Sequence, residues 1–374
     1  MGCFSLCSLS DRKICTISDG VAFTYPLNGY ISMKRIELFC IVFFICISCT
    51  NKREQWITEE LQHQVLNFSD AVIGSVGGIQ KEGNNLVILD FKQDSIFHWI
   101  DLNRNHYIGM YGVKGQGPDE FVYPSSLNSL GNLQMACFDN GKREVRMLHL
   151  NLAENEMGFS SLVKNTGSIK FDIVPLSKSR FVLNGEINGA MFALLNENGE
   201  VMSLSDGYPY KDDAESLIPS RFRALAYQGT LRVNSNAYFA YAIRGAKQLH
   251  LYQVESDEIK KIGEVIEGYG HYTPNMDTEG SYSVMNDGNF PECYLDLAVS
   301  DNFVYALYSG RSFNEYKISA FEGEMIYVYD WFGNPVKAYR LDVPISHFCV
   351  DEFEKKIYAI ANIPEPTIVK FEMN

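Results

Sequence analysis

Residues 109–127 read GMYGVKGQGPDEFVYPSSL and carry the most specific local signal for the fold. Gly112, Gly115, Gly117 and Pro118 lie there between two runs of β-forming residues. Glycine permits backbone conformations that other residues avoid, and proline fixes φ at about −65° without offering an amide donor. The stretch therefore predicts a compact, shaped turn between two strands.

Short predicted strands repeat on both sides of this turn. Runs rich in Val, Ile, Phe and Tyr alternate with Gly, Asn, Asp and Ser, and no helical period stands out after residue 71. The predicted strands are 85–90, 95–101 and 106–110; 133–139, 143–151 and 169–174; 180–185, 190–196 and 201–204; 237–242, 248–255 and 260–266; 303–308, 324–330 and 336–341; and 356–361 with 367–372. The pattern predicts an all-β domain of six similar units.

The turn resembles the connection between blades in TolB-like and NHL-like six-bladed β-propellers, whose motif is G-x-G-P-G-E-[FY] followed by Pro. The matching residues are Gly115, Gly117, Pro118, Glu120, Phe121 and Pro124. Asp119 stands where the family has a third glycine. The resemblance implies a six-bladed propeller in which these residues form a structural turn. It implies no activity, because propellers carry many unrelated functions.

The last predicted unit lacks a closing strand. A four-stranded sheet cannot bury both faces alone, so blades stack around an axis and the ring must close. We expect a segment between Val65 and Ile79 to complete the last unit, which would protect the strand edges at both chain ends. The predicted fold is thus an all-β, six-bladed β-propeller over residues 65–374, with ring closure by N- and C-terminal strands.

A basic pair and an apolar run precede this domain. Residues 33–49 read MKRIELFCIVFFICISC, and the apolar run 38–47 is too short for a spanning helix, which needs ~20 residues. It suits a signal peptide. The ending CISC resembles a bacterial lipobox, which implies a lipoprotein acylated at Cys49. A plain secretory signal or an internal apolar strand stays open.

The signal-peptide interpretation also assigns roles to the residues on either side of it. We expect Met33 to be the start, residues 1–32 to be a mis-annotated or disordered extension, and residues 50–64 to be a polar tether. An acylated Cys49 would hold the protein on a membrane, since each buried methylene contributes ~0.8 kcal/mol. The expected location is the cell envelope of a Gram-negative bacterium, at the outer membrane, facing either side of it.

The net charge argues against one class of binding partner, and the cysteine positions argue against a metal site. The chain of 374 residues has a net charge of −14, which would repel phosphate backbones, so no nucleic-acid partner is expected. We expect a monomer. Cys137, Cys293 and Cys349 are the cysteines of the domain, and their wide separation favours buried core residues over a metal site. One disulfide among them stays open.

No motif supports a familiar catalytic centre. The seven histidines are scattered, and the sequence has no H-E-x-x-H, G-x-S-x-G or P-loop pattern, so no catalytic or metal-ligating residue is predicted. Asp90, Asp139, Asn184 and Asp330 recur near strand ends, where we expect turn-forming hydrogen bonds. A calcium or magnesium ion on the propeller axis stays open as a cofactor.

Two longer insertions, 207–228 and 268–291, occupy the same place between units as the Gly112 turn. They should protrude on one face, where they either bind a ligand or cap the central channel. Their aromatic rings beside polar groups suit sugars or extended peptides. The candidate ligand-binding residues are Tyr208, Tyr210, Arg221, Arg223, His271, Tyr272 and Arg311.

Three functional hypotheses follow. The leading one is an envelope-anchored binding module for a protein, peptide or glycan. The alternative is a propeller enzyme, a lactonase-like hydrolase or glycan lyase, with an axial divalent metal. The third is a purely structural envelope component.

Overall fold

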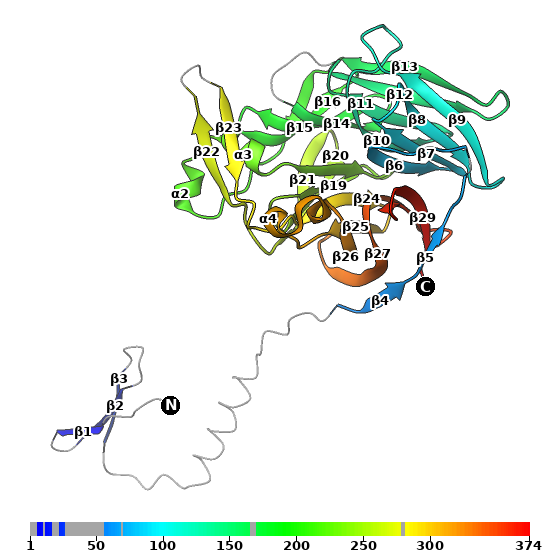
Figure 1. Cartoon of the computed structure of the whole chain (residues 1–374). Helices are drawn as coiled ribbons and strands as arrows, with labels where there is room; N and C mark the ends of the chain where they lie inside the picture. The colour runs from blue at the N-terminus through cyan, green and yellow to red at the C-terminus, as the bar shows by residue number, and fades with distance from the viewer. Residues whose placement is uncertain are drawn as a thin grey trace. The chain divides into compact units, whose positions relative to one another are not determined.

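A computed structural model of the chain describes residues 6–9, 12–16, 22–26, 56–68, 70–164, 170–277 and 281–374. The chain divides into two compact units, Met1–Gln55 and Trp56–Asn374, which are taken separately. In the first unit, three short strands form an antiparallel sheet: β1 (Leu6–Leu9), β2 (Arg12–Thr16) and β3 (Ala22–Pro26) (Figure 1). The predicted signal peptide and Cys49 lie outside the described residues.

The second unit is built mainly of antiparallel sheets, and four of them have four strands each, paired in chain order. The first has β6 (Val76–Glu82), β7 (Asn85–Asp90), β8 (Ser95–Asp101) and β9 (His106–Val113). The second has β10 (Pro124–Gly131), β11 (Gln134–Asp139), β12 (Glu144–Asn151) and β13 (Glu156–Lys164). The third has β14 (Lys170–Ser177), β15 (Arg180–Ile187), β16 (Ala190–Asn196) and β17 (Val201–Leu204). The fourth has β18 (Gly229–Val233), β19 (Tyr238–Ile243), β20 (Gln248–Glu255) and β21 (Glu258–Ile266).

An eight-stranded sheet completes the unit. Its strands are β24 (Tyr294–Val299), β25 (Phe303–Tyr308), β26 (Gly323–Asp330), β27 (Pro335–Asp351), β28 (Lys356–Asn362), β29 (Pro366–Glu372), β5 (His63–Val65) and β4 (Thr58–Leu61). The 17-residue β27 pairs with β26 mainly through its first half and with β28 through its second half. One long strand therefore joins two groups of strands.

The first strands of five sheets, together with β27 of the eight-stranded sheet, surround a common space. Strand β6 contacts β10, and the contacts continue in chain order through β14, β18, β24 and β27, which contacts β6 in turn. A cavity of about 570 Å³ is lined by residues from all six of these strands. The arrangement is that of a β-propeller, with sheets radiating from an axis.

The core lies between neighbouring sheets. One cluster joins Val87, Phe97 and Trp99 of the first sheet to Phe121 and to Met135 of the second. Strand β7 is buried along its whole length, because sheets cover both of its faces. This explains why its sequence, NLVILD, is a continuous apolar run instead of an alternating one.

The segment before the first sheet belongs to the domain. Strand β5 pairs antiparallel with β29, and β4 pairs in parallel with β27. The ring of Trp56 packs against those of Tyr327 and Tyr329, with centroids 4.8 and 5.2 Å apart. The tether predicted for residues 50–64 is therefore wrong from Trp56 onward, and the strand that pairs with the C-terminal one begins earlier than the predicted segment 65–79.

The predicted strands also differ from the observed ones in two respects. The run 169–174, predicted to close the second unit, belongs to β14, which opens the third sheet, while the second sheet is closed by β13. Strands β6, β10, β13, β18 and β24 of the propeller sheets lie outside the predicted strands. Among the described residues, no helix is both long and apolar enough to cross a membrane.

Candidate binding site

The turn at Gly115–Phe121 serves the fold. The Glu120 carboxylate accepts a hydrogen bond of 2.7 Å from the backbone amide of Gly117, and the amide of Gly115 donates to the Phe121 carbonyl at 2.9 Å. Phe121 is fully buried, and the Arg146 guanidinium lies 4.3 Å from its ring centroid while donating to the Glu120 carbonyl. The turn is thus fastened to the second sheet and presents no open site.

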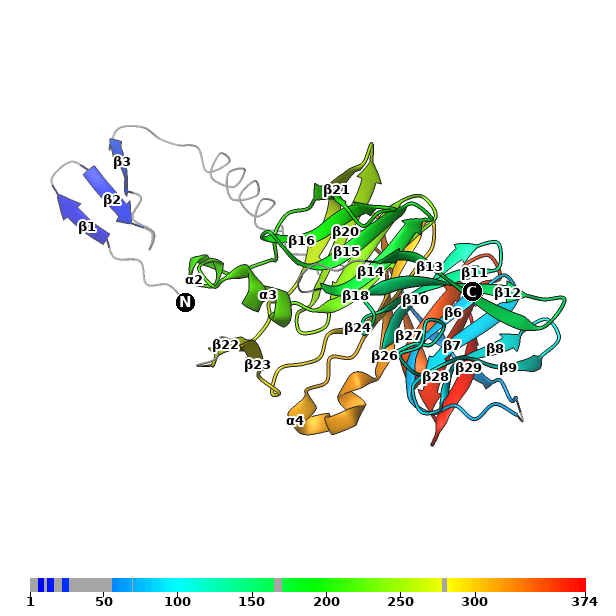
Figure 2. The same cartoon turned by 90° about the horizontal axis from the view of Figure 1, so that it is seen from above.

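Three connections gather at the end of the domain where the first strands begin, which we call the loop face. Between β17 and β18 lie α2 (Asp213–Ser216) and α3 (Ser220–Ala226), and between β21 and β24 lies a hairpin of β22 (Tyr272–Met276) and β23 (Tyr282–Asn286). Between β25 and β26 lie α4 (Phe313–Tyr316) and the 3-10 helix η1 (Lys317–Phe321). Both views show them on the same side (Figures 1 and 2).

The hairpin is held by α3. The rings of Phe222 and Tyr282 meet edge to face at 5.7 Å, and the Arg221 guanidinium lies 5.1 Å from the Tyr282 centroid. Tyr227, just after α3, meets Tyr272 edge to face at 6.0 Å. A two-stranded hairpin alone is marginally stable, so these aromatic contacts give it a defined position.

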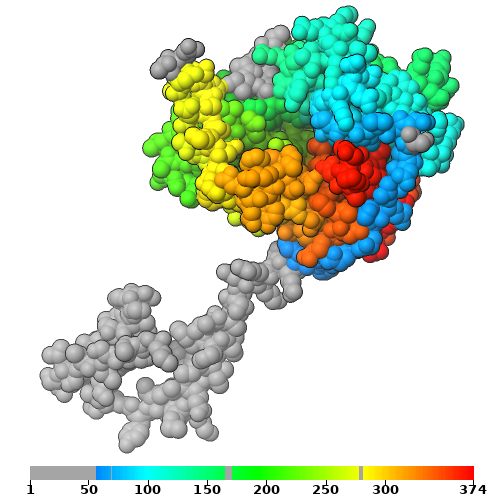
Figure 3. All heavy atoms as spheres, in the orientation of Figure 1, coloured from blue at the N-terminus to red at the C-terminus, as the bar shows by residue number. Residues whose placement is uncertain are grey.

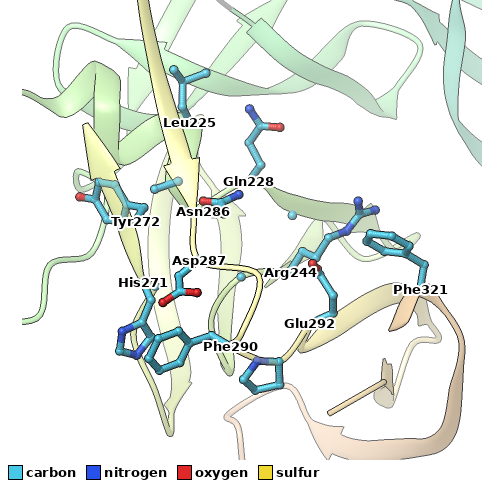
Figure 4. A pocket seen from close by; sticks show the side chains of 15 residues that line it. Leu225, Gln228, Arg244, His271, Tyr272, Asn286, Asp287, Phe290, Glu292 and Phe321 are labelled. Atoms are coloured by element: carbon cyan, nitrogen blue, oxygen red, sulfur yellow. The ribbon is translucent and has the colours of Figure 1, made fainter. Parts of the chain in front are cut away.

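A cavity of about 400 Å³ lies between α3, the hairpin and η1 (Figure 4). At one end the His271 ring stacks on Phe290, with centroids 3.3 Å apart and an interplanar angle of 7°. At the other end lie Arg244, Glu292 and Phe321 (Figure 4). The two ends therefore differ in chemistry: an aromatic stack faces a cationic side chain.

Arg244 lies at the junction of two cavities. Its guanidinium is 5.8 Å from the Phe321 centroid, and none of the described Asp or Glu side chains lies within 4.0 Å of it. Burial raises the pKa of Glu292, and the positive charge of Arg244 opposes that shift. A neighbouring cavity, also about 400 Å³, shares Arg244 and Phe321 with the first. We call the joined cavities the loop-face groove.

In the space-filling view the loop face is hollowed where the hairpin, the α4–η1 segment and the first sheet converge (Figure 3). The second cavity reaches Ser75 of the chain before β6 and His347 of β27. The groove therefore runs from the insertions toward the propeller axis.

The predicted ligand-binding residues divide into two groups. His271 and Tyr272 line the groove. Tyr208 is buried and donates to the Gly185 carbonyl at 3.1 Å, and Arg223 donates to the Tyr208 carbonyl at 2.7 Å while its guanidinium lies 5.6 Å from the ring of Tyr210. These contacts hold the first insertion in place.

The other two predicted arginines have partners of their own. Arg221 lies over Tyr282 in the contact between α3 and the hairpin, and Arg311 forms an ion pair with Glu324 at 2.6 Å. Sequence reasoning missed Arg244, which lies in the short turn between β19 and β20, outside both insertions. No local pattern marks it, because only the folded chain brings that turn beside Phe321.

The side chains near the propeller axis are polar, and one of them, Arg232, is itself a cation. Arg232 pairs with Asp296 at 3.0 Å, and His347 Nδ1 lies 3.5 Å from the same carboxylate. Asp172 accepts the hydroxyl of Ser126, and its buried Oδ1 has no hydrogen-bond partner. Burial raises the pKa of Asp172 to about 6. Because a guanidinium already neutralises Asp296, these side chains fit an axial divalent ion poorly.

The carboxylates near strand ends accept backbone amides, and Asp90 and Asp330 do so within turns, from Lys92 at 2.8 Å and from Phe332 at 2.9 Å. The Asn184 amide instead donates to the Met191 carbonyl at 3.2 Å. Asp90 accepts the amides of Gly74 and Ser75 at 2.7 and 2.8 Å, and Asp139 likewise accepts those of Val122 and Tyr123 at 2.8 and 2.9 Å. Within the part of the chain that the structure describes, no group of three or more His, Cys, Asp or Glu side chains could hold a metal ion.

A family profile and one solved structure agree with this architecture. The profile of the TolB-like 6-blade propeller-like family matches residues 57–353. A candidate exported protein from Bacteroides fragilis is similar in structure, with a TM-score of 0.52 and 14% identity over 84% of this chain and 98% of its own. The β-propeller domain of Cps50 (Swd1) from Myceliophteria thermophila matches with a TM-score of 0.43 and 10% identity, over 81% of this chain and 98% of its own. No curated protein matches the chain.

The sheets around a shared axis and the loop-face groove define the molecule as a β-propeller with one elaborated face. The match over residues 57–353 then places it within a family: the chain belongs to the TolB-like 6-blade propeller-like family.

Proposed function

We propose that the domain is a closed six-bladed propeller. The eight-stranded sheet would supply the fifth and sixth blades, with β27 ending one and opening the other. Two observations support this count: six strands, β6, β10, β14, β18, β24 and β27, line one cavity, and the last of them contacts the first. In this proposal β5, paired with β29, is the outer strand of the sixth blade and closes the ring.

We propose that the protein is an envelope-anchored lipoprotein whose loop-face groove binds a protein, peptide or glycan ligand. The observation that carries this proposal is the convergence of three insertions on one groove in which Arg244 has no carboxylate partner among the described residues. A rigid scaffold that presents elaborated loops is the usual arrangement of a binding site.

The test is a ligand screen with matched variants. The full chain and a Phe290→Ala, Arg244→Gln double variant are compared on the same glycan and peptide arrays. A Phe353→Ala variant is the control, because this ring is 98% exposed and lies in the turn between β27 and β28, outside the groove lining. Loss of a ligand in the double variant alone supports the groove. Equal retention by all three proteins contradicts it.

The anchor at Cys49 needs its own experiment. Mass spectrometry of the mature N-terminus should find an acylated Cys49, and Cys49→Ala should move the protein from the membrane fraction to the soluble fraction. An unmodified N-terminus at or before Met33 would rule out the lipoprotein. Separation of the inner and outer membranes of the same cells tests the proposed outer-membrane location.

The alternative of a propeller enzyme with an axial metal is less favoured, since Arg232 already pairs with Asp296. A stoichiometric divalent ion in purified protein, together with a lower melting temperature in chelator, would restore it. A purely structural envelope component predicts no ligand in any screen.

A further inference from the structure

We propose that the ligand of the loop-face groove is an acidic saccharide, whose carboxylate is held by Arg244 and whose sugar ring packs on the Phe290–His271 stack. This inference rests on the proposed binding function and names its ligand class. It arises from three features of the groove: an arginine without a carboxylate partner among the described residues, an exposed aromatic face, and several polar side chains in the first cavity.

The cation is the most discriminating of these features. Arg244 is the one arginine or lysine among the described residues that line the groove, and two neighbouring cations are paired elsewhere: Arg311 with Glu324 at 2.6 Å and Lys247 with Glu267 at 2.6 Å. Arg221 and Arg223 of α3 also form no ion pair with a described carboxylate, but Arg221 lies over Tyr282 and Arg223 donates to the Tyr208 carbonyl. Arg244 instead faces the ring of Phe321. Because the whole chain carries a charge of −14, an anion would be repelled unless a local cation received it. A planar guanidinium is well suited to a carboxylate, with two parallel hydrogen bonds.

Glu292 is the carboxylate that interacts electrostatically with Arg244, but it does not fully neutralise the arginine's charge. Glu292 lines the same end of the cavity, but it forms no ion pair with Arg244 within 4.0 Å. Burial also favours its neutral form, since it raises the pKa of the side chain. Glu292 is therefore placed to contact a ligand hydroxyl while Arg244 contacts an acid group.

The opposite end offers a flat apolar face. Phe290 is 40% exposed, and His271 stacked on it keeps its ring fixed. A sugar ring presents C–H bonds on one face and hydroxyls at its rim, so it can cover an aromatic ring while its hydroxyls stay hydrogen-bonded. The side chains between the two ends are polar: Gln228, Asn286 and Asp287 (Figure 4).

The polar side chains of the first cavity favour a saccharide over a peptide. A peptide ending in a carboxylate would also satisfy Arg244, but it would need apolar pockets for its side chains and paired backbone groups. The first cavity offers the Gln228 and Asn286 amides and the Asp287 and Glu292 carboxylates, which suit a row of hydroxyls. The second cavity is more apolar, with Leu295, Ile318 and Ile360 in its lining, so a peptide with a terminal carboxylate is the competing ligand that the titration must exclude. Each cavity, at about 400 Å³, has the size of a small-ligand site.

The experiment is calorimetric titration of the full chain with matched sugars. The probes are short oligosaccharides of glucuronate or galacturonate and, as partners, the neutral glucose or galactose oligosaccharides of equal length. We expect the acidic member to bind about ten-fold or more tightly, which is the range of one charged hydrogen-bonded pair. Arg244→Gln should bring the affinity for the acidic sugar down to that of the neutral one. Arg244→Lys should retain part of the difference.

Controls separate the possible failures. Arg104→Gln removes an exposed arginine in the turn between β8 and β9 and should leave the titration unchanged. Phe290→Ala should weaken acidic and neutral sugars alike. A groove that prefers neutral sugars, or a terminal peptide carboxylate, would overturn the acidic-saccharide proposal but keep the binding function. Acidic-sugar binding that survives in Arg244→Gln would overturn the role of Arg244, and an absence of any groove-dependent ligand would overturn both proposals.

Discussion

At the scale of single residues, Glu120 shows why the glycine-rich turn has its sequence. A Cβ on Gly115 would lie 2.0 Å from Glu120 Oε2, and one on Gly117 would lie 3.0 Å from the same carboxylate. Asp119 occupies the position of the family's third glycine, and its side chain is 91% exposed. A side chain therefore fits at that position because it points into solvent, while the two glycines make room for the carboxylate.

Gly115→Ala should lower the free energy of unfolding by about 1–3 kcal/mol, the range of a side chain forced into occupied space. The Cβ would displace the Glu120 carboxylate from the Gly117 amide. Urea denaturation of Gly115→Ala, Glu120→Ala and the double variant checks this. Gly115→Ala should lower the free energy of unfolding by clearly less when Glu120 is already alanine. Strictly additive losses in the double variant would contradict this explanation.

Asp172 should leave a signature in the pH dependence of stability. Its pKa is raised from 3.8 to about 6, chiefly by burial, although Ser126 and Arg232 favour its charged form. Between about pH 4 and pH 6 the folded chain then binds more protons than the unfolded chain, so this group lowers stability as pH rises through that window. The asparagine of the Asp172→Asn variant cannot ionise, so this variant should not lose stability through this window.

The stability of Asp172→Asn relative to the wild type should therefore increase from about pH 4 to pH 6 and stay level above pH 7. Urea denaturation at several pH values measures this difference. A difference independent of pH would show that Asp172 has an ordinary pKa in the folded protein.

At the scale of elements, the strands nearest the axis were the hardest to predict. Strand β6 reads VGGIQKE and β10 reads PSSLNSLG, whereas β7, just outside β6, reads NLVILD. Six strands converge on one axial space, so small and polar residues suit the inner positions. Those residues are the ones that sequence patterns assign to turns. The second strands, packed between sheets, have the apolar runs that made the repeat visible.

The N-terminal strands should contribute measurably to stability. A chain beginning at Leu66 lacks Trp56, β4 and β5, which leaves the edges of β29 and β27 without these partners. We expect its melting temperature to fall by several degrees relative to a chain beginning at Trp56, since about 1 kcal/mol shifts a domain of this size by ~2–4 °C or less. Calorimetry on the two chains measures the difference, and equal melting temperatures would contradict a role of β5 in closing the ring.

At the scale of the whole molecule, the three cysteines of the domain report on the integrity of the core. Cys137, Cys293 and Cys349 are free and buried, which answers the open question of a disulfide among them. Burial raises the pKa of the Cys293 and Cys349 thiols to about 12. Thiolates are the reactive species, so these thiols should be nearly inert in the folded protein.

Iodoacetamide at pH 8 should therefore leave these three cysteines unmodified in the native protein and should alkylate them in denaturant. Peptide mass spectrometry assigns each site. Rapid native labelling of Cys293 would show that its loop-face environment opens in solution, and a band shift on non-reducing gels would contradict the free thiols.

The sequence could predict the all-β class and the propeller family, because the repeat and the Gly115–Phe121 turn are local signals. It placed the insertions at the correct connections and two groove residues, His271 and Tyr272, within them. It could not separate these from Tyr208 and Arg221, whose partners Gly185 and Tyr282 lie outside the first insertion, or from Arg223, which donates to the Tyr208 carbonyl within it. Arg244 becomes notable only through the lack of a carboxylate partner, and that depends on the folded surroundings.

The parallel pairing of β4 with β27 has a mechanical consequence. Any pull on the chain at residue 55 reaches the domain through β4, whose four residues, Thr58–Leu61, run alongside Ala338–Leu341. Load along such a ladder is shared by several hydrogen bonds at once instead of opening them one by one. Strand β27 belongs to the same sheet as the C-terminal strand β29. A force applied at the N-terminal end of the domain therefore acts on the sheet that holds both ends of the domain.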